Sequence, residues 1–180
     1  MPTVNNPPAL IAQATAAWCF AAVEQMVRAY YGLGPATQYE IARRNTAALA
    51  TVDPQVQERW ELAQVLDQSA NINELGGANP NSNIVKLVSS QWNAFDHTTT
   101  GGHFVDGLTA DIARREIDNN RVFVIGTHIH YYLVYGYTVN GKDLDLHILD
   151  PWPAGQGGTR TRIGLREFLE MPARVAIIFG

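Results

Sequence analysis

The chain has 180 residues, of which 46% are hydrophobic and 17% are charged, and its formal net charge is -4. This size and apolar content predict a single domain over residues 1–180 that buries a substantial core. The 13 basic residues are scattered, which argues against nucleic acid or an anionic membrane as a partner. No apolar stretch approaches the ~20 residues of a membrane span and no signal-peptide pattern is visible, so we expect a soluble protein.

The first half of the chain carries helical patterns. Apolar residues dominate 16–31 and Gly32 follows them, which predicts a buried helix that ends at this glycine. The tetrapeptide Thr37-Gln38-Tyr39-Glu40 matches a capping box and predicts a short helix to about residue 45. Two further helices are expected at 53–66 and 84–92, with an Asn- and Gly-rich loop over 71–83.

The second half carries mainly strand patterns. Runs rich in β-formers predict strands over 121–127, 130–139, 144–149 and 175–179. Asn140-Gly141 predicts a two-residue hairpin turn between the second and third of these strands. A polar loop over 96–107 and a helix capped by Thr109 and ending near 117 are expected before them. Helices first and strands later predict an α+β fold with a helical N-terminal half, a C-terminal antiparallel sheet and a cleft where the halves meet.

Cys19, the chain's one cysteine, lies near the start of the first predicted helix. Unpaired backbone N–H groups at a helix N-terminus favour thiolate over thiol, and the thiolate is the nucleophilic form. A cysteine in an apolar helix is also commonly an inert core residue. The residues that accompany Cys19 in the sequence favour the nucleophile.

Hydrolysis of an amide by a thiolate requires an imidazole as general acid and base, and a group that orients the imidazole. His130 and Asp150 are the candidates for these two roles. The Asn140-Gly141 turn would bring the strand that ends at Asp150 beside His130. The alternative for Asp150, which precedes a proline, is a simple turn residue at the end of the strand.

Two local motifs resemble those of papain-type cysteine peptidases. Gln13 lies six positions before Cys19, which is the family's spacing between the oxyanion glutamine and the nucleophile. His130 lies six positions before Gly136-Tyr137, and this matches the family's histidine strand. The chain departs from the family at Phe20, because the family usually has Trp directly after the nucleophile.

The resemblance implies a papain-like fold and a cysteine peptidase that needs no cofactor. Gln13 would then donate a side-chain N–H in the oxyanion hole, although a loop glutamine is more commonly solvated. Trp152 lies two residues after Asp150, where the family has an aromatic residue that shields the His–Asp hydrogen bond from water. The alternative for Trp152 is ordinary core packing.

The chain is most similar to a compact bacterial branch of this family that includes effector proteases. This resemblance implies a protein or peptide substrate, a role as a bacterial effector or toxin, and a cognate inhibitor or immunity protein as a partner. The protein would be cytoplasmic as synthesised or exported as an effector by a non-classical route. It is also compatible with a piece excised from a longer protein.

Several alternatives remain open at the level of sequence. His128 would lie on the same face of the strand as His130 and competes for its role, and a metal site of His128, His130 and His147 is conceivable. We expect no metal, because no second cysteine or carboxylate motif has metal-site spacing. Other functions for the thiol are a transglutaminase-like or deamidase activity, a peptidoglycan amidase, a redox or metal-sensing role, and an inactive papain-fold binding module.

Overall fold

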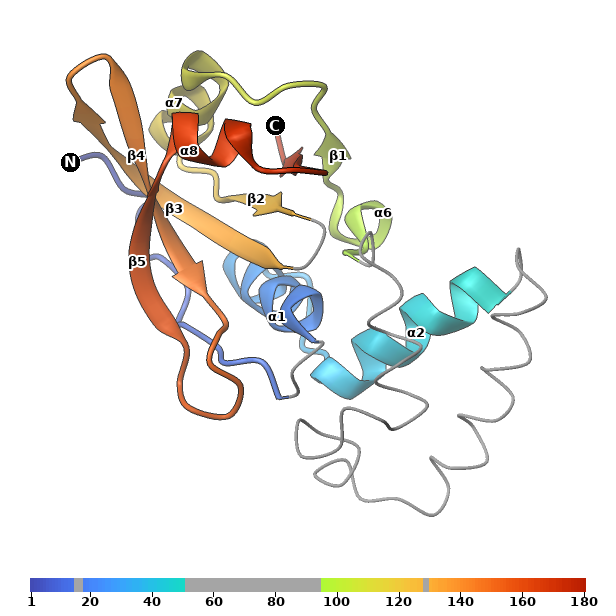
Figure 1. Ribbon diagram of the computed structural model, residues 1–180. Helices are drawn as coiled ribbons and strands as arrows, with labels where there is room; N and C mark the ends of the chain where they lie inside the picture. Colours follow the sequence, from blue (N-terminus) through green and yellow to red (C-terminus); the bar gives the residue numbers. More distant parts are fainter. Residues whose placement is uncertain (15–17, 51–94, 128–129) are drawn as a thin grey trace.

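The computed structural model describes residues 1–14, 18–50, 95–127 and 130–180. In these ranges five helices accompany one open, antiparallel, six-stranded sheet (Figure 1). The predicted α+β class is therefore confirmed. The helices expected at 53–66 and 84–92, and the loop expected between them, lie outside the described residues.

The elements follow one another in the order helix, helix, then a mixture of strands and helices. The helices are α1 (Cys19–Tyr31), α2 (Gln38–Ala50), α6 (His97–Thr100), α7 (Ala110–Asp118) and α8 (Leu165–Glu170). The strands are β1 (His103–Phe104), β2 (Phe123–Gly126), β3 (Tyr131–Asn140), β4 (Asp143–Asp150), β5 (Thr159–Gly164) and β6 (Val175–Ile178). They lie side by side in the order β1-β6-β2-β3-β4-β5, with α1 on one side of the sheet and α7 and α8 on the other (Figure 1).

Helix α1 begins at Cys19 and ends at the predicted glycine. Gly32 adopts the left-handed conformation with φ of 65°, and its N–H donates to the carbonyl of Arg28. Glycine adopts this conformation without steric cost, which is why the helix stops there. The three residues before Trp18, over which the helix was expected to begin, lie outside the described residues. Cys19 therefore occupies the first helical position that the structure shows.

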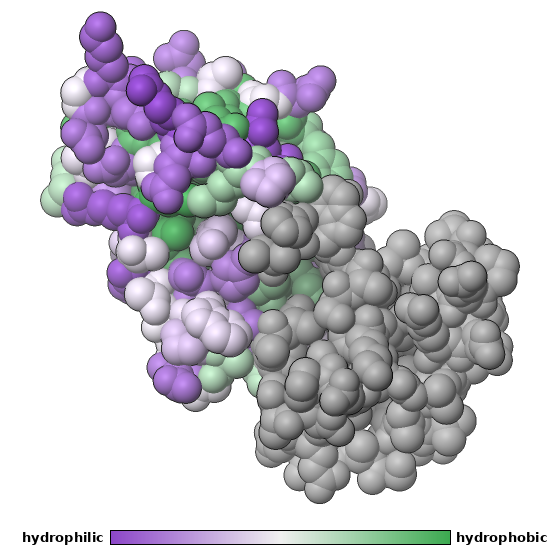
Figure 2. Space-filling view, viewed as in Figure 1, coloured by the Kyte–Doolittle hydropathy of each residue, from purple (hydrophilic) through white to green (hydrophobic). Residues whose placement is uncertain are grey.

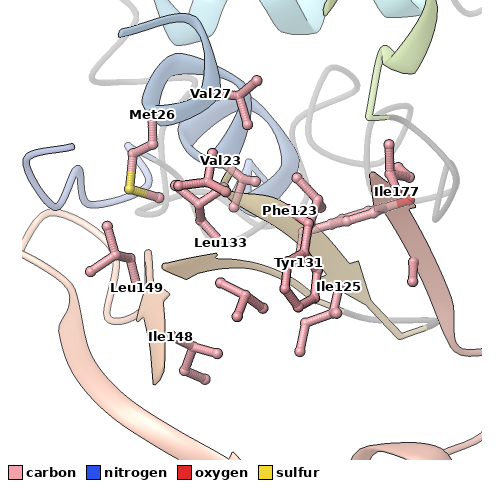
Figure 3. Close-up of a cluster of buried hydrophobic side chains, with 14 of the residues drawn as sticks. Val23, Met26, Val27, Phe123, Ile125, Tyr131, Leu133, Ile148, Leu149 and Ile177 are labelled. Carbon is pink, nitrogen blue, oxygen red and sulfur yellow. The ribbon is translucent and has the colours of Figure 1, made fainter. Parts of the chain in front are cut away.

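Helix α1 is held against the sheet by its apolar side chains. Val23 and Met26 are fully buried, and they face Leu133 of β3 and Leu149 of β4 in the core (Figure 3). Burial of a side chain of this size stabilises a fold by about 1.5–3 kcal/mol. The same packing fixes the N-terminal end of α1, and with it Cys19, near the ends of β3 and β4.

The predicted capping box is present at the start of α2. The N–H of Thr37 donates to the carboxylate of Glu40 at 2.8 Å, and the N–H of Glu40 donates to the Thr37 hydroxyl at 3.1 Å. These reciprocal bonds satisfy two backbone donors that the helix itself leaves unpaired. The helix runs to Ala50 and is longer than the sequence predicted.

The hairpin of β3 and β4 turns where the sequence predicts. Gly141 has a φ of 61°, and Asn140 pairs with Asp143 across the turn. A β-bulge between Val134 and Gly136 then shifts the pairing by one residue, so that Leu133 pairs with Leu149. A bulge of this kind places one extra residue in one strand and changes which side chains share a face.

Gly136 of the histidine motif has a packing role. A Cβ atom at this position would lie 2.8 Å from the carbonyl oxygen of Pro2 and 2.8 Å from the side chain of Thr3. The N-terminal segment crosses the sheet at this point, since Val4 donates its N–H to Tyr135 and Tyr137 donates its N–H to Pro2. Only glycine leaves room for this close approach of two backbone segments.

Two elements of the C-terminal half were missed by the sequence analysis. Strand β5 begins with Thr159, Arg160, Thr161 and Arg162, which are all exposed, and it lies at the edge of the sheet. An edge strand with polar side chains lacks the hydrophobic alternation that marks a strand in sequence. Helix α8 is only six residues long. Its N-cap residue is Gly164, so no side chain caps its first turn and the sequence carries no capping signal.

The segment 96–107 is a further correction, because it was expected to be a loop. It contains α6, capped by the Asp96 carboxylate, which accepts from the N–H of Thr99, and the two-residue strand β1. Both elements are too short to produce a periodic pattern. The predicted cap of α7 is confirmed, because the Thr109 hydroxyl accepts from the N–H of Ile112.

The surface seen in the orientation of Figure 1 is largely polar. Figure 2 shows hydrophilic side chains across most of the coloured surface, with hydrophobic side chains in small areas between them. None of the helices in the described ranges combines the length and the apolar content that crossing a membrane requires.

A buried carboxylate links α1, α2 and the segment before α6. Glu24 is fully buried, accepts from Arg28 at 2.8 Å and is paired with Arg44, which also contacts Asp96 at 3.2 Å. Burial raises the pKa of Glu24, and the hydrogen bonds and charges of the two arginines oppose this rise. A buried charge is tolerated only when it is paired in this way.

We expect Glu24→Ala to lower the free energy of unfolding by about 3 kcal/mol, because it leaves Arg28 and Arg44 without the buried carboxylate that they surround. Urea denaturation of the purified variant measures the change. Glu170→Ala, at the exposed end of α8, is the matched control and should leave the stability near that of the wild type. Equal stabilities of the two variants would contradict the structural role of Glu24.

Candidate active site

The thiol of Cys19 lies at the N-terminus of α1. The residue is 6% exposed, and the first backbone bonds of the helix run from the N–H groups of Ala21 and Ala22 to the carbonyl of Trp18. The N–H groups of the first helical turn have no acceptor within the helix itself, so the positive end of the helix dipole lies beside the sulfur. This is the helix-terminal position that the sequence predicted for the nucleophile.

His130 and Asp150 form a direct hydrogen bond. The His130 Nε2 atom and the Asp150 Oδ1 atom are 2.6 Å apart, and their side chains are only 15% and 19% exposed. His130 immediately precedes β3, and Asp150 is the last residue of β4. The structure thus brings together two residues that are twenty positions apart in the sequence, as the hairpin prediction required.

The thiol of Cys19 also acts on the imidazole of His130. Burial alone would lower the pKa of His130, but hydrogen bonds to Asp150 and Cys19 and the negative charges of both groups raise the pKa to about 9. Because Nε2 is engaged by Asp150, the nitrogen left for an interaction with Cys19 is Nδ1. An imidazole held by a carboxylate on one side and influenced by a thiol on the other can activate a sulfur nucleophile and hold the resulting imidazolium.

Asp150 is itself held in place by the backbone that follows it. Its Oδ1 atom accepts a second bond, from the N–H of Trp152 at 2.8 Å. A carboxylate with two donors has little freedom to rotate away from the histidine. The Trp152 residue is 49% exposed, so the core-packing interpretation of this tryptophan is wrong. Its role as a shield of the His130–Asp150 bond stays a prediction.

Gln13 is fully buried, in contrast to the solvated glutamine that is usual in loops. Its backbone N–H donates to the carbonyl of Pro151 at 2.9 Å, and its carbonyl accepts from the N–H of Gly155 at 2.9 Å. The segment that carries Gln13 therefore lies against the turn that directly follows Asp150. The three residues between Ala14 and Trp18 lie outside the described residues.

Tyr132 contacts the histidine, a contact that was not predicted from the sequence. The ring of Tyr132 stands edge-on to the ring of His130, with centroids 4.6 Å apart and an interplanar angle of 81°. Burial, followed by the charges of Asp150 and Cys19, raises the pKa of Tyr132, which reflects a position close to both groups. Its spacing of two residues from His130 was the available signal, since residues two apart in an extended strand share a side.

Of the two alternative histidines, His128 and His147, the structure describes only His147. His128 lies outside the described residues, so its distance from Cys19 stays untested. The His147 Nε2 atom bonds to the hydroxyl of Thr138 at 2.7 Å, and the ring packs against Tyr135. In the part of the chain that the structure describes, no three His, Cys, Asp or Glu side chains form a group suited to a metal ion.

Comparison of the chain with protein-family models gives no match, and comparison with curated proteins gives none. A buried cysteine and a half-buried, hydrogen-bonded histidine and aspartate are residue types suited to nucleophilic catalysis by a thiol.

The raised pKa of His130 leads to a prediction for its titration. We expect the imidazole to titrate near pH 9 in the folded chain, and we expect Asp150→Asn or Cys19→Ala to move its pKa down toward the ordinary value of about 6.5. NMR spectra of histidine-labelled protein between pH 5 and 10 measure this directly. His147, whose pKa is lowered by burial and by Arg162, provides a control within the same spectra.

The sign of the linked stability change follows from the same shift. A pKa raised on folding stabilises the folded chain fully below about pH 6.5, and this contribution is lost as the pH rises through about 9. At roughly 1.4 kcal/mol for each pKa unit, the loss is about 3 kcal/mol. A His130 resonance that titrates near 6.5 in the wild type would contradict the paired geometry.

Proposed function

We propose that the chain is a papain-like cysteine peptidase that hydrolyses peptide bonds through a thioester intermediate. The observation that carries the proposal is the hydrogen bond of His130 to Asp150, together with the effect of the Cys19 thiol on the same imidazole. The two motifs in the sequence, Gln13 before Cys19 and His130 before Gly136-Tyr137, support the same assignment.

The acylation step begins with attack of the Cys19 sulfur on the carbonyl carbon of the scissile bond. A new carbon–sulfur bond forms, and the electron pair of the C=O bond moves to the oxygen to give an oxyanion. As the oxyanion collapses, the C–N bond breaks and the His130 imidazolium gives its proton to the leaving amine. The products of this step are a free amine and an acyl group held on sulfur as a thioester.

Deacylation returns the enzyme to its starting state. Neutral His130 takes a proton from water, and the resulting hydroxide attacks the thioester carbonyl. The carbon–sulfur bond then breaks, which releases a carboxylic acid and restores the thiolate beside the imidazolium. Asp150 stabilises the imidazolium whenever it forms and keeps the ring in the orientation that serves Cys19.

Stabilisation of the oxyanion is assigned to two donors. One is the backbone N–H of Cys19, in the first turn of α1, and the other is the side-chain amide of Gln13. Donors held rigidly where charge develops contribute more to catalysis than mobile ones. The burial of Gln13 and the two hydrogen bonds of its backbone support such a role.

The test of the proposal is the appearance of new protein N-termini. We expect wild-type chain added to a cell lysate to generate new N-termini, and we expect Cys19→Ala and His130→Ala to generate none above background, because one lacks the nucleophile and the other the proton donor. Terminal-peptide mass spectrometry makes the comparison. Released ammonia or isopeptide links would instead indicate the deamidase or transglutaminase alternative, and cleavage of peptidoglycan alone would indicate the amidase.

Asp150 provides a second test of the mechanism. Asp150→Asn keeps an amide oxygen that can accept from His130, so we expect a mild loss, whereas Asp150→Ala should lower kcat on the order of ten-fold or more with KM nearly unchanged. Steady-state kinetics on a peptide identified in the lysate experiment measures both constants. Asp145→Ala, another carboxylate on β4, is the matched control. Wild-type kcat in Asp150→Ala would mean that this carboxylate is only a turn residue.

A further inference from the structure

Gln38 bonds to the backbone on both sides of Gln13. Its side-chain Nε2 donates to the carbonyl of Ala12 at 2.9 Å, and its Oε1 accepts from the N–H of Ala14 at 2.7 Å. One carboxamide thus uses its donor and its acceptor at the same time, on two residues that flank a third. The contacts span more than twenty positions in the sequence, so they are tertiary contacts rather than local turns.

The backbone of Gln13 itself is bonded to a different part of the molecule. Its N–H and its carbonyl are taken by Pro151 and Gly155, in the turn after Asp150. The tripeptide 12–14 is therefore held by four hydrogen bonds, two from α2 and two from the turn after β4. Four bonds to three residues leave the Cα of Gln13 little freedom to move.

Helix α2 is a firm support for such a contact. The Thr37 and Glu40 capping box fixes its first turn, and Arg44, two turns later, pairs with the buried Glu24 of α1. Gln38 is the first residue of this helix and is itself half-buried. A side chain on an anchored helix positions a neighbouring segment better than one on a mobile loop.

We infer that Gln38 is a positioning residue for the oxyanion hole, acting on the substrate oxyanion through Gln13. This role rests on the proposed function, in which the amide of Gln13 stabilises the oxyanion. Gln38 holds the Gln13 backbone so that this amide meets the oxygen at the moment when the charge develops. Displacement of a donor by about 1 Å is enough to lose much of its contribution.

Two small reagents separate this role from a general effect on the site. Iodoacetamide alkylates the sulfur by displacing iodide from a saturated carbon, and no oxyanion forms. With p-nitrophenyl acetate, the sulfur attacks the carbonyl, an oxyanion forms and collapses, p-nitrophenolate leaves, and the acetyl group stays on Cys19. Both reactions need the thiolate, but only the second needs the oxyanion hole. The rates measured with Cys19→Ala are subtracted, because they report reaction of each reagent at sites other than this thiol.

We expect Gln13→Ala to slow acylation on the order of a hundred-fold and Gln38→Ala on the order of ten-fold, with alkylation rates within about two-fold of the wild type. The double variant should acylate no more slowly than Gln13→Ala alone, because Gln38 acts only through Gln13. Gln38→Glu should also lose acylation, since a carboxylate can accept from Ala14 but cannot donate to Ala12.

Gln25→Ala is the matched control. Gln25 also donates its side-chain amide to a backbone carbonyl, but to that of Ala36, at 2.7 Å, rather than to one of the tripeptide 12–14. We expect its acylation rate to equal that of the wild type. Thermal melts of all variants show whether each one is folded.

Four results would overturn the inference. Acylation by Gln38→Ala at the wild-type rate, or a double variant much slower than Gln13→Ala, would show that Gln38 does not act through Gln13. Loss of alkylation together with acylation in Gln38→Ala would show that the residue supports the fold in general. A wild-type chain that reacts with neither reagent would overturn the proposed function itself, and the positioning role with it.

Discussion

The arrangement of the candidate site depends on the β-bulge between Val134 and Gly136. The turn at Asn140-Gly141, continued without interruption, would pair Leu133 with Asp150. The bulge shifts the register by one residue, so that Leu133 pairs with Leu149, and the same register continued by one residue sets Asp150 opposite Tyr132. Cross-strand partners share a face of the sheet, and a shift of one residue exchanges the two faces. The bulge therefore sets which side chains of β3 share a face with Asp150, whose carboxylate bonds to His130 just before this strand.

Burial and charge pairing act in opposite directions on the histidine at the centre of the site. The low-dielectric surroundings of His130 disfavour imidazolium, and the paired carboxylate and thiol favour it enough to raise its pKa to about 9. The raised pKa requires both partners, because with only one of them the same cost of burying the imidazolium would be offset less. An imidazolium that persists at neutral pH is the proton donor that the proposed leaving amine needs. The protonation state of His130 therefore depends on the positions of Asp150 and Cys19 beside it.

Helix α2 connects the site to the rest of the fold at two points. Near its start, Gln38 holds the backbone around Gln13, and further along, Arg44 pairs with the buried Glu24 of α1. Helix α1 in turn presents Cys19. Helix α2 thus contacts both the helix that carries the nucleophile and the segment that carries the proposed oxyanion donor. Polar contacts of this kind specify relative positions, which apolar packing alone leaves less strictly defined.

Local chemistry in the sequence was sufficient to predict several elements. Gly32 ends α1, the Thr37 and Glu40 pair caps α2, Thr109 caps α7, and Asn140-Gly141 turns the hairpin, because each signal acts within a few residues. The order of Cys19, His130 and Asp150, and the spacings of Gln13 before Cys19 and of His130 before Gly136-Tyr137, indicated a thiol site. Strand β5 and helix α8 were not predicted, because an exposed edge strand and a six-residue helix leave no periodic pattern in the sequence.

The bulge, the Tyr132 contact and the hydrogen bonds of Gln38 to the backbone around Gln13 were decided by tertiary structure alone. Each of these joins segments through close packing or long-range hydrogen bonds, whose partners no local pattern of residues can specify.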